Sequence, residues 1–264
     1  VLALAGQAMA ADSTSSQTQD GKENIAEVSQ SLAPFASATQ TQTGKGNNHL
    51  AVQSDSTSDI QQSANGQYNA GYADQLFENG SQVTQHASGS YNDAFASQSL
   101  GLDNQSLQTQ QGAQNASTVW QESQEGSKAT SWQSGQRNEA FIEQIFGGSN
   151  NRSSINQTGQ ENYAAAEHLS HVDGDIQVYQ DGTGNWAYGD QRDGTGGTIG
   201  IGQYGGGNSV EVWQDNQTAS QASVTQSGQM NEGYIDQSFG VSNKVSLSQQ
   251  GTAYASWSDQ FETS

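Results

Sequence analysis

Eleven glycines recur along this 264-residue chain at an almost constant spacing, and no other feature restricts the fold as much. Successive members lie 23 residues apart, except for one interval of 22 and one of 24. Such a period is the mark of a solenoid or another repeat architecture. The chain from about 15 to 260 therefore reads as eleven tandem copies. The glycines are Gly21, Gly44, Gly66, Gly89, Gly112, Gly135, Gly159, Gly182, Gly205, Gly228 and Gly251.

Each glycine belongs to a longer pattern, Gln-x-Gly-x-x-Asn-x-Ala-x-x-x-Gln, which is clearest around Gly182. Three amide positions recur: a first Gln, an Asn and a closing Gln. Ala64 and Ala87 replace the first Gln in two copies, each with a Gln two residues earlier. Tyr254 replaces the Asn of the last copy, and His168 replaces one closing Gln. The pattern is thus strict enough for its exceptions to be informative.

Residues of like character alternate on either side of each glycine. Around Gly205, alternate residues of 199–203 and of 208–214 are aliphatic or amide-bearing. Period two is the spacing of a β-strand, and glycine permits the sharp turn between two strands. Each copy is therefore predicted to form a β-arch of two strands. The predicted fold is an all-β solenoid of eleven stacked arches in a cross-β arrangement.

The recurring amides are predicted to point inward and to form ladders along the stack. A buried amide without partners is costly, whereas amides stacked in register can donate to one neighbour and accept from another. The predicted ladder residues are Gln19, Asn24, Gln30, Gln42, Asn47, Gln53, Asn69, Gln75, Asn92, Gln98, Gln110, Asn115, Gln121, Gln133, Asn138, Gln144, Gln157, Asn162, His168, Gln180, Asn185, Gln191, Gln203, Asn208, Gln214, Gln226, Asn231, Gln237, Gln249 and Gln260.

Composition and charge exclude several classes of protein. Hydrophobic residues make up 31% of the chain and the formal net charge is −20, values that suggest disorder unless a regular repeat intervenes. The seven Lys and Arg residues form no basic stripe, which argues against nucleic-acid binding and against attachment to an anionic membrane. No apolar run is long enough to span a bilayer, so membrane insertion is not expected.

The first ten residues resemble the end of a secretory signal. A short apolar run is followed by Ala8-Met9-Ala10, which has the A-x-A form of a signal-peptidase site. Residues 1–10 are therefore interpreted as a signal remnant and 11–264 as the repeat domain. The chain has no Cys, so an exported form would be stable without disulfides.

The repeat resembles that of the curlin family, the unit of curli amyloid fibres on Gram-negative bacteria. The segment 203–209, Gln-Tyr-Gly-Gly-Gly-Asn-Ser, is especially similar. The resemblance implies export through the Sec system and an outer-membrane secretion channel, a periplasmic chaperone and a nucleator subunit. It also implies an extracellular fibre that serves the biofilm matrix, surface adhesion and aggregation. The last copy has only Lys244 as a cation, which favours the major, fibre-forming subunit over the nucleator.

The sequence leaves few other functions open. The four histidines sit in no nucleophilic arrangement, and neither a cofactor nor a catalytic residue is predicted. His168 and His171 as a metal pair are disfavoured against a substituted ladder residue, so no metal site is assigned. Calcium at acidic turns stays an alternative. So do a non-polymerising secreted adhesin and the minor nucleator subunit.

Outward aromatic residues and the acidic charge suggest how copies would interact. Trp120, Trp132, Tyr179, Trp186 and Trp213 are among the aromatics whose parity places them outside the arch. These residues either reflect the preference of aromatic side chains for exposed strand positions or take part in adhesion and lateral bundling of fibres. Mutual repulsion of the acidic chains would keep them soluble before assembly.

Overall fold

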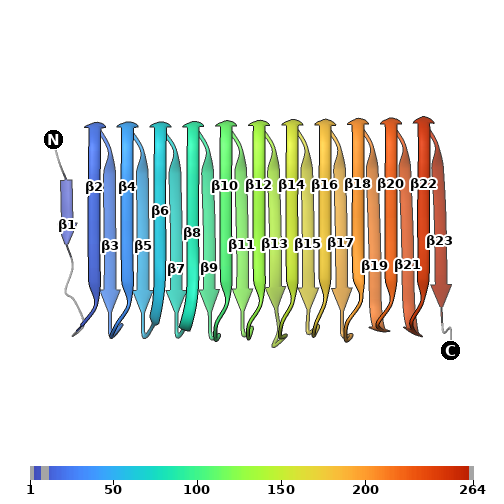
Figure 1. Cartoon of the computed structure of the whole chain (residues 1–264), viewed down its shortest axis with the longest axis horizontal. Coiled ribbons are helices and arrows are strands. Elements are labelled where there is room, and N and C mark those ends of the chain that lie inside the picture. The colour runs from blue at the N-terminus through green and yellow to red at the C-terminus, as the bar shows by residue number, and fades with distance from the viewer. Residues whose placement is uncertain (1–2, 7–11, 262–264) are drawn as a thin grey trace.

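The computed structural model describes residues 3–6 and 12–261, and every regular element in them is a β-strand. The strands form two parallel sheets, of twelve and eleven strands, that face each other along the whole molecule. Even-numbered strands run in one direction and odd-numbered strands return in the other (Figure 1). The predicted β-solenoid of about eleven turns is confirmed.

Each copy supplies one strand to each sheet and forms one coil of the solenoid. The eleven-stranded sheet contains β2 (Thr14–Lys22), β4 (Ser37–Lys45), β6 (Thr57–Gln67), β8 (Asn79–Ser90), β10 (Gln105–Ala113), β12 (Lys128–Gln136), β14 (Arg152–Gln160), β16 (Asp175–Thr183), β18 (Thr198–Gly206), β20 (Gln221–Gln229) and β22 (Lys244–Thr252). The twelve-stranded sheet contains β1 (Ala3–Gly6), β3 (Ile25–Ser31), β5 (Asn48–Ser54), β7 (Ala70–Leu76), β9 (Asp93–Ser99), β11 (Ala116–Glu122), β13 (Glu139–Ile145), β15 (Tyr163–Leu169), β17 (Trp186–Arg192), β19 (Ser209–Thr218), β21 (Glu232–Val241) and β23 (Ala255–Phe261).

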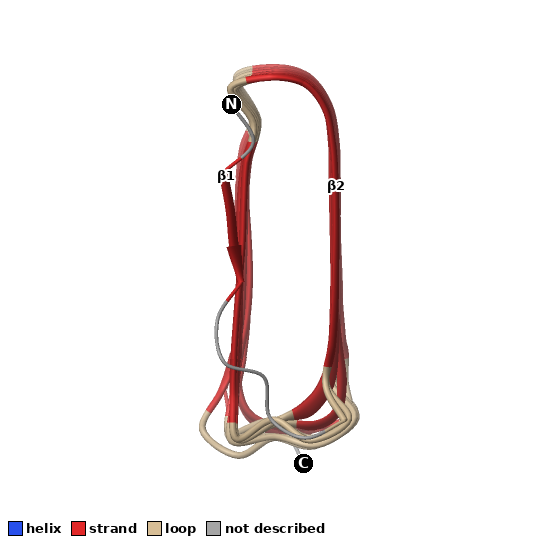
Figure 2. Ribbon diagram, turned by 90° about the vertical axis from the view of Figure 1, so that its left-hand side faces the viewer, coloured by secondary structure: helices blue, strands red, loops and turns tan. Residues whose placement is uncertain are grey.

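Seen along the solenoid axis, the coils superimpose as a narrow rectangle with a rounded glycine arch at one end and a looser second turn at the other (Figure 2). The strands keep their register through all coils, with each arch glycine paired to the glycine of the next coil, as in Gly135↔Gly159. The 22-residue interval is absorbed in the second turn beside a register shift between Thr57 and Asp59. The 24-residue interval is absorbed between Gln144 and Ser149. The second turn therefore tolerates length changes that the arch does not.

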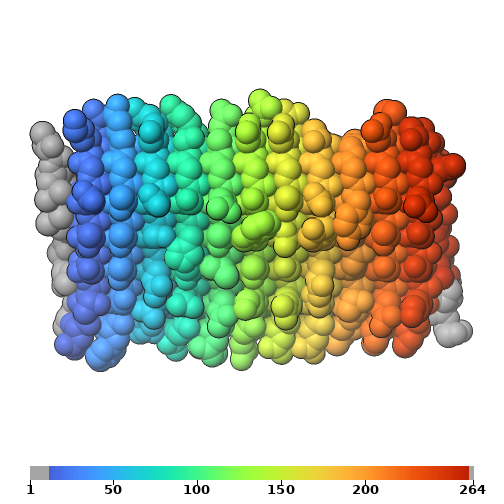
Figure 3. Space-filling view, turned by 45° about the horizontal axis from the view of Figure 1, so that its top comes forward, coloured from blue at the N-terminus to red at the C-terminus, as the bar shows by residue number. Residues whose placement is uncertain are grey.

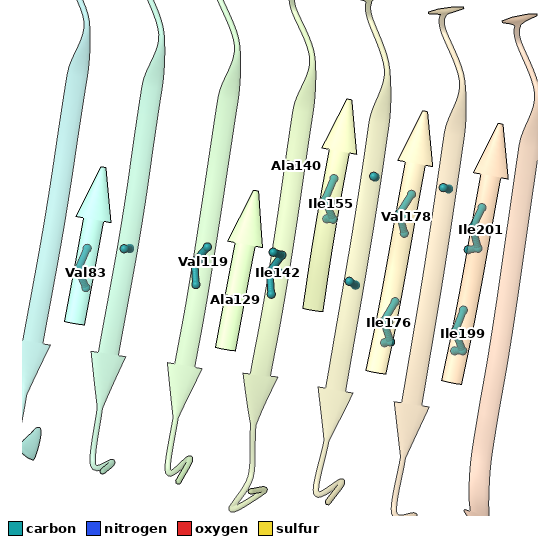
Figure 4. Packing of buried hydrophobic residues seen from close by; sticks show 14 of the residues in the cluster. Val83, Val119, Ala129, Ala140, Ile142, Ile155, Ile176, Val178, Ile199 and Ile201 are labelled. Atoms are coloured by element: carbon teal, nitrogen blue, oxygen red, sulfur yellow. The ribbon is translucent and has the colours of Figure 1, made fainter. Parts of the chain in front are cut away.

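The apolar core is a thin layer of aliphatic side chains between the two sheets (Figure 4). Ile155, Ile176 and Ile199 come from the eleven-stranded sheet, and Ala140 and Ile142 face them from the other. Alternate residues of each strand are buried, as period-two patterning requires. A single coil could not bury this surface alone, so the core exists only because the coils stack without gaps (Figure 3).

The arch glycines are required by backbone geometry. All eleven have positive φ, between 111° and 140°. A Cβ at ten of them would collide with the carbonyl oxygen of the glycine in the next coil, and at Gly251 it would collide with the ring of Tyr254. Glycine is the residue that combines this conformation with this close approach. The arch therefore sets both the turn and the coil spacing.

Replacing an arch glycine should destabilise the folded chain. For Gly135→Ala we expect a loss of at least ~1–3 kcal/mol from backbone strain alone, and more from the collision with Gly159. Gly200→Ala is the matched control, because a Cβ there meets no atom within 4 Å. Urea unfolding followed by circular dichroism measures both. Equal stability of the two variants would contradict this account of the arch.

Candidate functional site: the interior ladders and the ends of the stack

The Asn residues form a continuous ladder at the start of the second strand of each coil. From Asn47 to Asn231, each side-chain amide nitrogen donates to the Oδ1 of the Asn in the preceding coil, at 2.9–3.2 Å. The same nitrogen donates to the carbonyl of the arch glycine in the following coil, as in Asn138 to Gly159 at 3.0 Å. That Oδ1 also accepts a backbone N–H from the following coil, as in Asn162 N to Asn138. The Asn ladder thus joins three successive coils at the arch.

The closing Gln residues form a second ladder inside the twelve-stranded sheet. Each Gln Nε2 donates to the Oε1 of the closing Gln in the next coil, from Gln30 to Gln144, at 2.7–2.9 Å. The ladder stops at His168 and resumes from Gln191 to Gln260, at 2.7–3.0 Å. The hydrogen bonds to neighbouring amides satisfy groups that no water reaches, which is why a chain with few aliphatic residues can bury them.

The first Gln residues form a third ladder, in two pieces. Gln19 donates to Gln42, and a longer run joins Gln110 to Gln249 at 2.7–3.1 Å. Ala64 and Ala87, which lie in the gap, are buried without an amide. Through the gap a fourth ladder runs two residues earlier in each strand, and the sequence analysis had noted only its Gln62 and Gln85. Its members are Gln17, Gln40, Gln62, Gln85 and Gln108, joined at 2.8–3.2 Å.

This offset ladder could have been found from sequence. Its members recur at the same 22- and 23-residue spacing and on the same inward parity as the predicted ladder residues. From Ile155 onward the same position becomes aliphatic, as in Val178 and Ile201. Amide and aliphatic side chains therefore replace each other coil by coil while some ladder always continues.

A further set of hydrogen bonds, missed in the sequence analysis, stabilises the second turn. Side-chain oxygens of Ser and Asn at or just before the start of the first strand accept the backbone N–H of the equivalent residue in the next coil. The run Ser81, Asn104, Ser127, Asn151 shows the pattern, at 3.0–3.1 Å. Ser and Asn are common throughout the chain, so composition alone did not single out this position.

The ladders have opposite directions. Every Gln ladder donates toward the C-terminal end of the stack, and the Asn ladder donates toward the N-terminal end. The first Gln of each run therefore has no Gln in the preceding coil that could donate to its Oε1. The buried Oε1 atoms of Gln30, Gln110 and Gln191 have no hydrogen-bond partner. Gln30 lies in the first coil, Gln110 lies in the coil after Ala87, and Gln191 lies in the coil after His168. The unpartnered acceptors are thus a direct consequence of ladder direction.

His168 interrupts the closing-Gln ladder with a ring that is fully buried. Its Nδ1 lies 3.0 Å from Ser153 Oγ, and its Nε2 has no partner. Burial first, then the adjacent His171, lowers the pKa of His168 to about 3. Burial also lowers the pKa of His171 to about 4. Both rings are therefore neutral at pH 7.

The two ends of the stack differ. At the N-terminal end β1 pairs in parallel with β3, from Ala3↔Ile25 to Gly6↔Val28. At the C-terminal end Tyr254 stands at the Asn position and is 55% exposed. Its backbone N–H still bonds to Asn231 Oδ1, but its side chain supplies no amide for a further coil. All four ladders therefore reach the N-terminal end, whereas only the closing-Gln ladder and the first-Gln ladder reach the C-terminal end.

Within residues 3–6 and 12–261 there is no group of three or more His, Cys, Asp or Glu side chains placed to hold a metal ion. In the same residues there is no helix, and so none that could cross a membrane. The outward aromatics stack in short rows across neighbouring coils, as in Tyr72, Phe95 and Trp120 with ring centroids about 5 Å apart. The interior ladders and the two ends are therefore the features that a function can use.

Comparison with known proteins identifies the repeat. A family model described as the curlin associated repeat matches residues 133–159, 173–205 and 218–251. The chain carries curlin repeats. The parallel pairing of the matched curlin repeats continues through the coils before them, with one register shift between Thr57 and Asp59. The curlin repeat family is associated with extracellular curli fibres. Both this family and the β-solenoid fold have a structural rather than an enzymatic role. No curated protein matches the chain.

Replacing His168 with Gln should restore the interrupted ladder. The new amide can accept from Gln144 and donate to the unpartnered Oε1 of Gln191, so we expect a gain of about 1 kcal/mol in the free energy of unfolding at pH 7.5. Urea unfolding of the two proteins measures it. His86→Gln is the control, because His86 points outward and lies in no interior ladder.

The same variant should be less sensitive to acid. The pKa of His168 is about 3 in the folded chain and 6.5 in the unfolded chain, so the unfolded state binds more protons between these values. Stability therefore falls as the pH drops below 6.5, by on the order of 2 kcal/mol at pH 5 from this residue. His168→Gln should lose less stability than the parent between pH 7.5 and 5. An unchanged loss would show that His168 is not the acid-sensitive group.

Proposed function

We propose that this chain is the major structural subunit of an extracellular, curli-like amyloid fibre that forms by head-to-tail addition of folded copies. The single observation that carries the proposal is the buried Gln30 Oε1, an acceptor without a partner at the N-terminal end of the stack. At the other end Gln260 continues the same ladder in the donor direction. The end of one copy is thus complementary to the start of another.

Ladder direction makes this addition polar. If the last coil of one copy stacked on the first coil of the next, Gln260 would donate to Gln30 and Gln249 to Gln19. Two N-terminal ends brought together would instead oppose acceptor to acceptor. The unpaired backbone groups of the terminal strands favour the same addition, since open sheet edges are templates for further pairing. Head-to-tail growth is therefore the arrangement that continues the closing-Gln and first-Gln ladders, while the Asn ladder is interrupted at Tyr254.

Strand β1 covers one of these edges. It occupies the side of β3 that the β23 of another copy would need. We propose that residues 1–10 are removed during Sec-dependent export, which exposes the edge outside the cytoplasm. A secretion channel in the outer membrane, a periplasmic chaperone and a nucleator subunit are the partners that the curlin family suggests. The fibre would serve the biofilm matrix, adhesion and aggregation, without a cofactor or enzymatic activity.

A chain that begins at Ala11 should elongate into unbranched fibres, and the full 264-residue chain should do so more slowly. Negative-stain electron microscopy and fibre diffraction test this, with a meridional reflection expected near about 4.8 Å. Seeds of preformed fibre should shorten the lag. A folded chain from Ala11 that stays monomeric under all conditions would instead indicate a solitary secreted adhesin.

Gln260→Glu should slow elongation without unfolding the subunit. The carboxylate can still accept from Gln237, but it cannot donate to Gln30 of another copy. A buried acceptor left unpaired costs about 1–3 kcal/mol, so we expect a roughly tenfold or greater loss in elongation rate. Gln250→Glu is the matched control, because it adds the same charge to the last coil on an outward position. Equal rates for the two variants would argue against the ladder junction.

Acid or salt should accelerate growth. Repulsion between chains of net charge −20 weakens as carboxylates gain protons or as ions screen them. Burial raises the pKa of Asp190 to about 6, so part of this neutralisation occurs well above the sequence pI of about 4.1. We expect shorter lag times at pH 4.5 than at pH 8. Fibre growth is measured by the fluorescence of an amyloid-binding dye. Equal lag times would show that charge repulsion does not limit the rate of fibre growth.

A further inference from the structure

The two outer surfaces of the solenoid differ in chemistry. We name the outward side chains of the twelve-stranded sheet the acidic face and those of the eleven-stranded sheet the hydroxyl face. The acidic face carries one cation, Arg192, and thirteen carboxylate residues: Glu27, Asp74, Asp93, Glu122, Glu139, Glu143, Glu167, Asp190, Glu211, Asp215, Glu232, Asp236 and Asp259. Of these, Asp190 is buried, where it accepts hydrogen bonds from Tyr188 and Arg192. Burial, then the charges of Glu167 and Glu122, raises the pKa of Glu143, which is a sign of crowded like charge.

The hydroxyl face is nearly neutral. Its four carboxylates are Asp20, Asp59, Asp175 and Asp181, and its five cations are Lys22, Lys45, Lys128, Arg152 and Lys244. Most other outward positions on it hold Thr, Ser, Gln or Asn. Thr39, Thr41 and Thr43 on β4 are typical, and all three are exposed. Most of the charge of the solenoid walls thus lies on one side.

The hydroxyl face is also flat and large. Its strands lie side by side with little visible twist (Figure 1). Sheets of many strands that stay flat are typically stabilised by stacking on another sheet. Eleven strands at about 4.8 Å, each with four outward residues, give a surface of roughly 50 by 23 Å. That exceeds the roughly 800 Å² that each partner contributes to a standard protein interface.

The face has a shallow hollow that outward side chains of another sheet could enter. Gly200 and Gly202 on β18 leave space flanked by Gln177 and Ser223, in two adjoining cavities of about 500 and 380 Å³. Small hydroxyl and amide side chains permit the close, interdigitated contact of paired cross-β sheets. Neither the hollow nor the flatness is used by the head-to-tail contact.

We propose that fibres of this chain associate laterally through the hydroxyl face, which packs on the hydroxyl face of a second copy and leaves both acidic faces in solvent. Charge decides the pairing. Two acidic faces would bring thirteen carboxylates against thirteen, whereas two hydroxyl faces bring together surfaces whose charges almost cancel. Because like charges brought together across a contact are costly, the hydroxyl pairing is favoured. The inference extends the proposed fibre and rests on it for its filamentous form.

The outward aromatics are divided between the two faces. Trp132, Tyr179 and Tyr204 lie on the hydroxyl face and would be covered in the lateral contact. Trp120 and Trp213 lie on the acidic face with Tyr188, whose hydroxyl donates to Glu167 at 2.8 Å. That face would stay in solvent, so its aromatics are not the bundling contact.

The test compares two doubly substituted chains of identical net charge. Thr109→Glu with Thr225→Glu places two carboxylates on the hydroxyl face, and Ser29→Glu with Thr118→Glu places two on the acidic face. All four residues point outward in mid-strand. Seeded elongation rates and the number of filaments in each bundle are measured by electron microscopy. We expect a roughly tenfold lower fraction of bundled filaments for the hydroxyl-face variant only, because its new carboxylates would be buried unpaired.

The outcomes separate the two proposals. Equal loss of bundling in both variants, or loss in the acidic-face variant alone, overturns the lateral contact while leaving elongation standing. If the hydroxyl-face variant forms bundles as the parent does but no longer binds a neutral polysaccharide such as cellulose, the lateral contact is overturned. The hydroxyl face is then a glycan-binding surface. If no chain forms filaments, the fibre proposal fails. Sedimentation of the folded chain then tests the lateral contact by itself. Self-association of the folded chain must weaken in the hydroxyl-face variant and stay unchanged in the acidic-face variant.

Discussion

The hydrogen bond between side-chain amides of neighbouring coils is the interaction on which the rest of the structure depends. The interior is too poor in aliphatic residues to be stabilised by burial of apolar surface alone. Amides can fill it only if each finds its partner in the coil above or below. That condition demands parallel coils in register, which the arch glycines permit by letting Gly135 and Gly159 stack in close contact. Irregular lengths are consequently confined to the second turn.

Direction is the second property that the ladders confer. Since Gln ladders donate one way and the Asn ladder the other, each coil has two unlike sides. Inside the chain this explains where acceptors stay unpartnered, after Ala87 and after His168. At the end of the stack it explains the buried, unpartnered oxygen of Gln30. The bonds that hold the subunit together are thus the same bonds that would join one subunit to the next.

The solenoid separates its interior from its exterior more strictly than a globular fold does. Inward positions are restricted to amide, small or aliphatic side chains and a few histidines, because each side chain meets its counterpart in the next coil. Outward positions carry no such demand, and the two outer faces have diverged into an acidic and a hydroxyl surface. High net charge and regular stacking are compatible for this reason. Most of the charged residues lie where they are solvated, and most of the neutral surface lies on the opposite side.

The sequence by itself determined the number of coils, the arch positions and the inward amides, because a period of 23 and a parity of two follow directly from residue spacing. It pointed to Gln62 and Gln85 but not to the ladder that joins them to Gln40 and Gln108. Only the tertiary structure decided which amide donates to which, since that depends on side-chain orientation rather than on residue type. It likewise decided that β1 lies on the edge of β3, because residues 3–6 belong to no copy of the repeat and the pairing leaves no periodic signal.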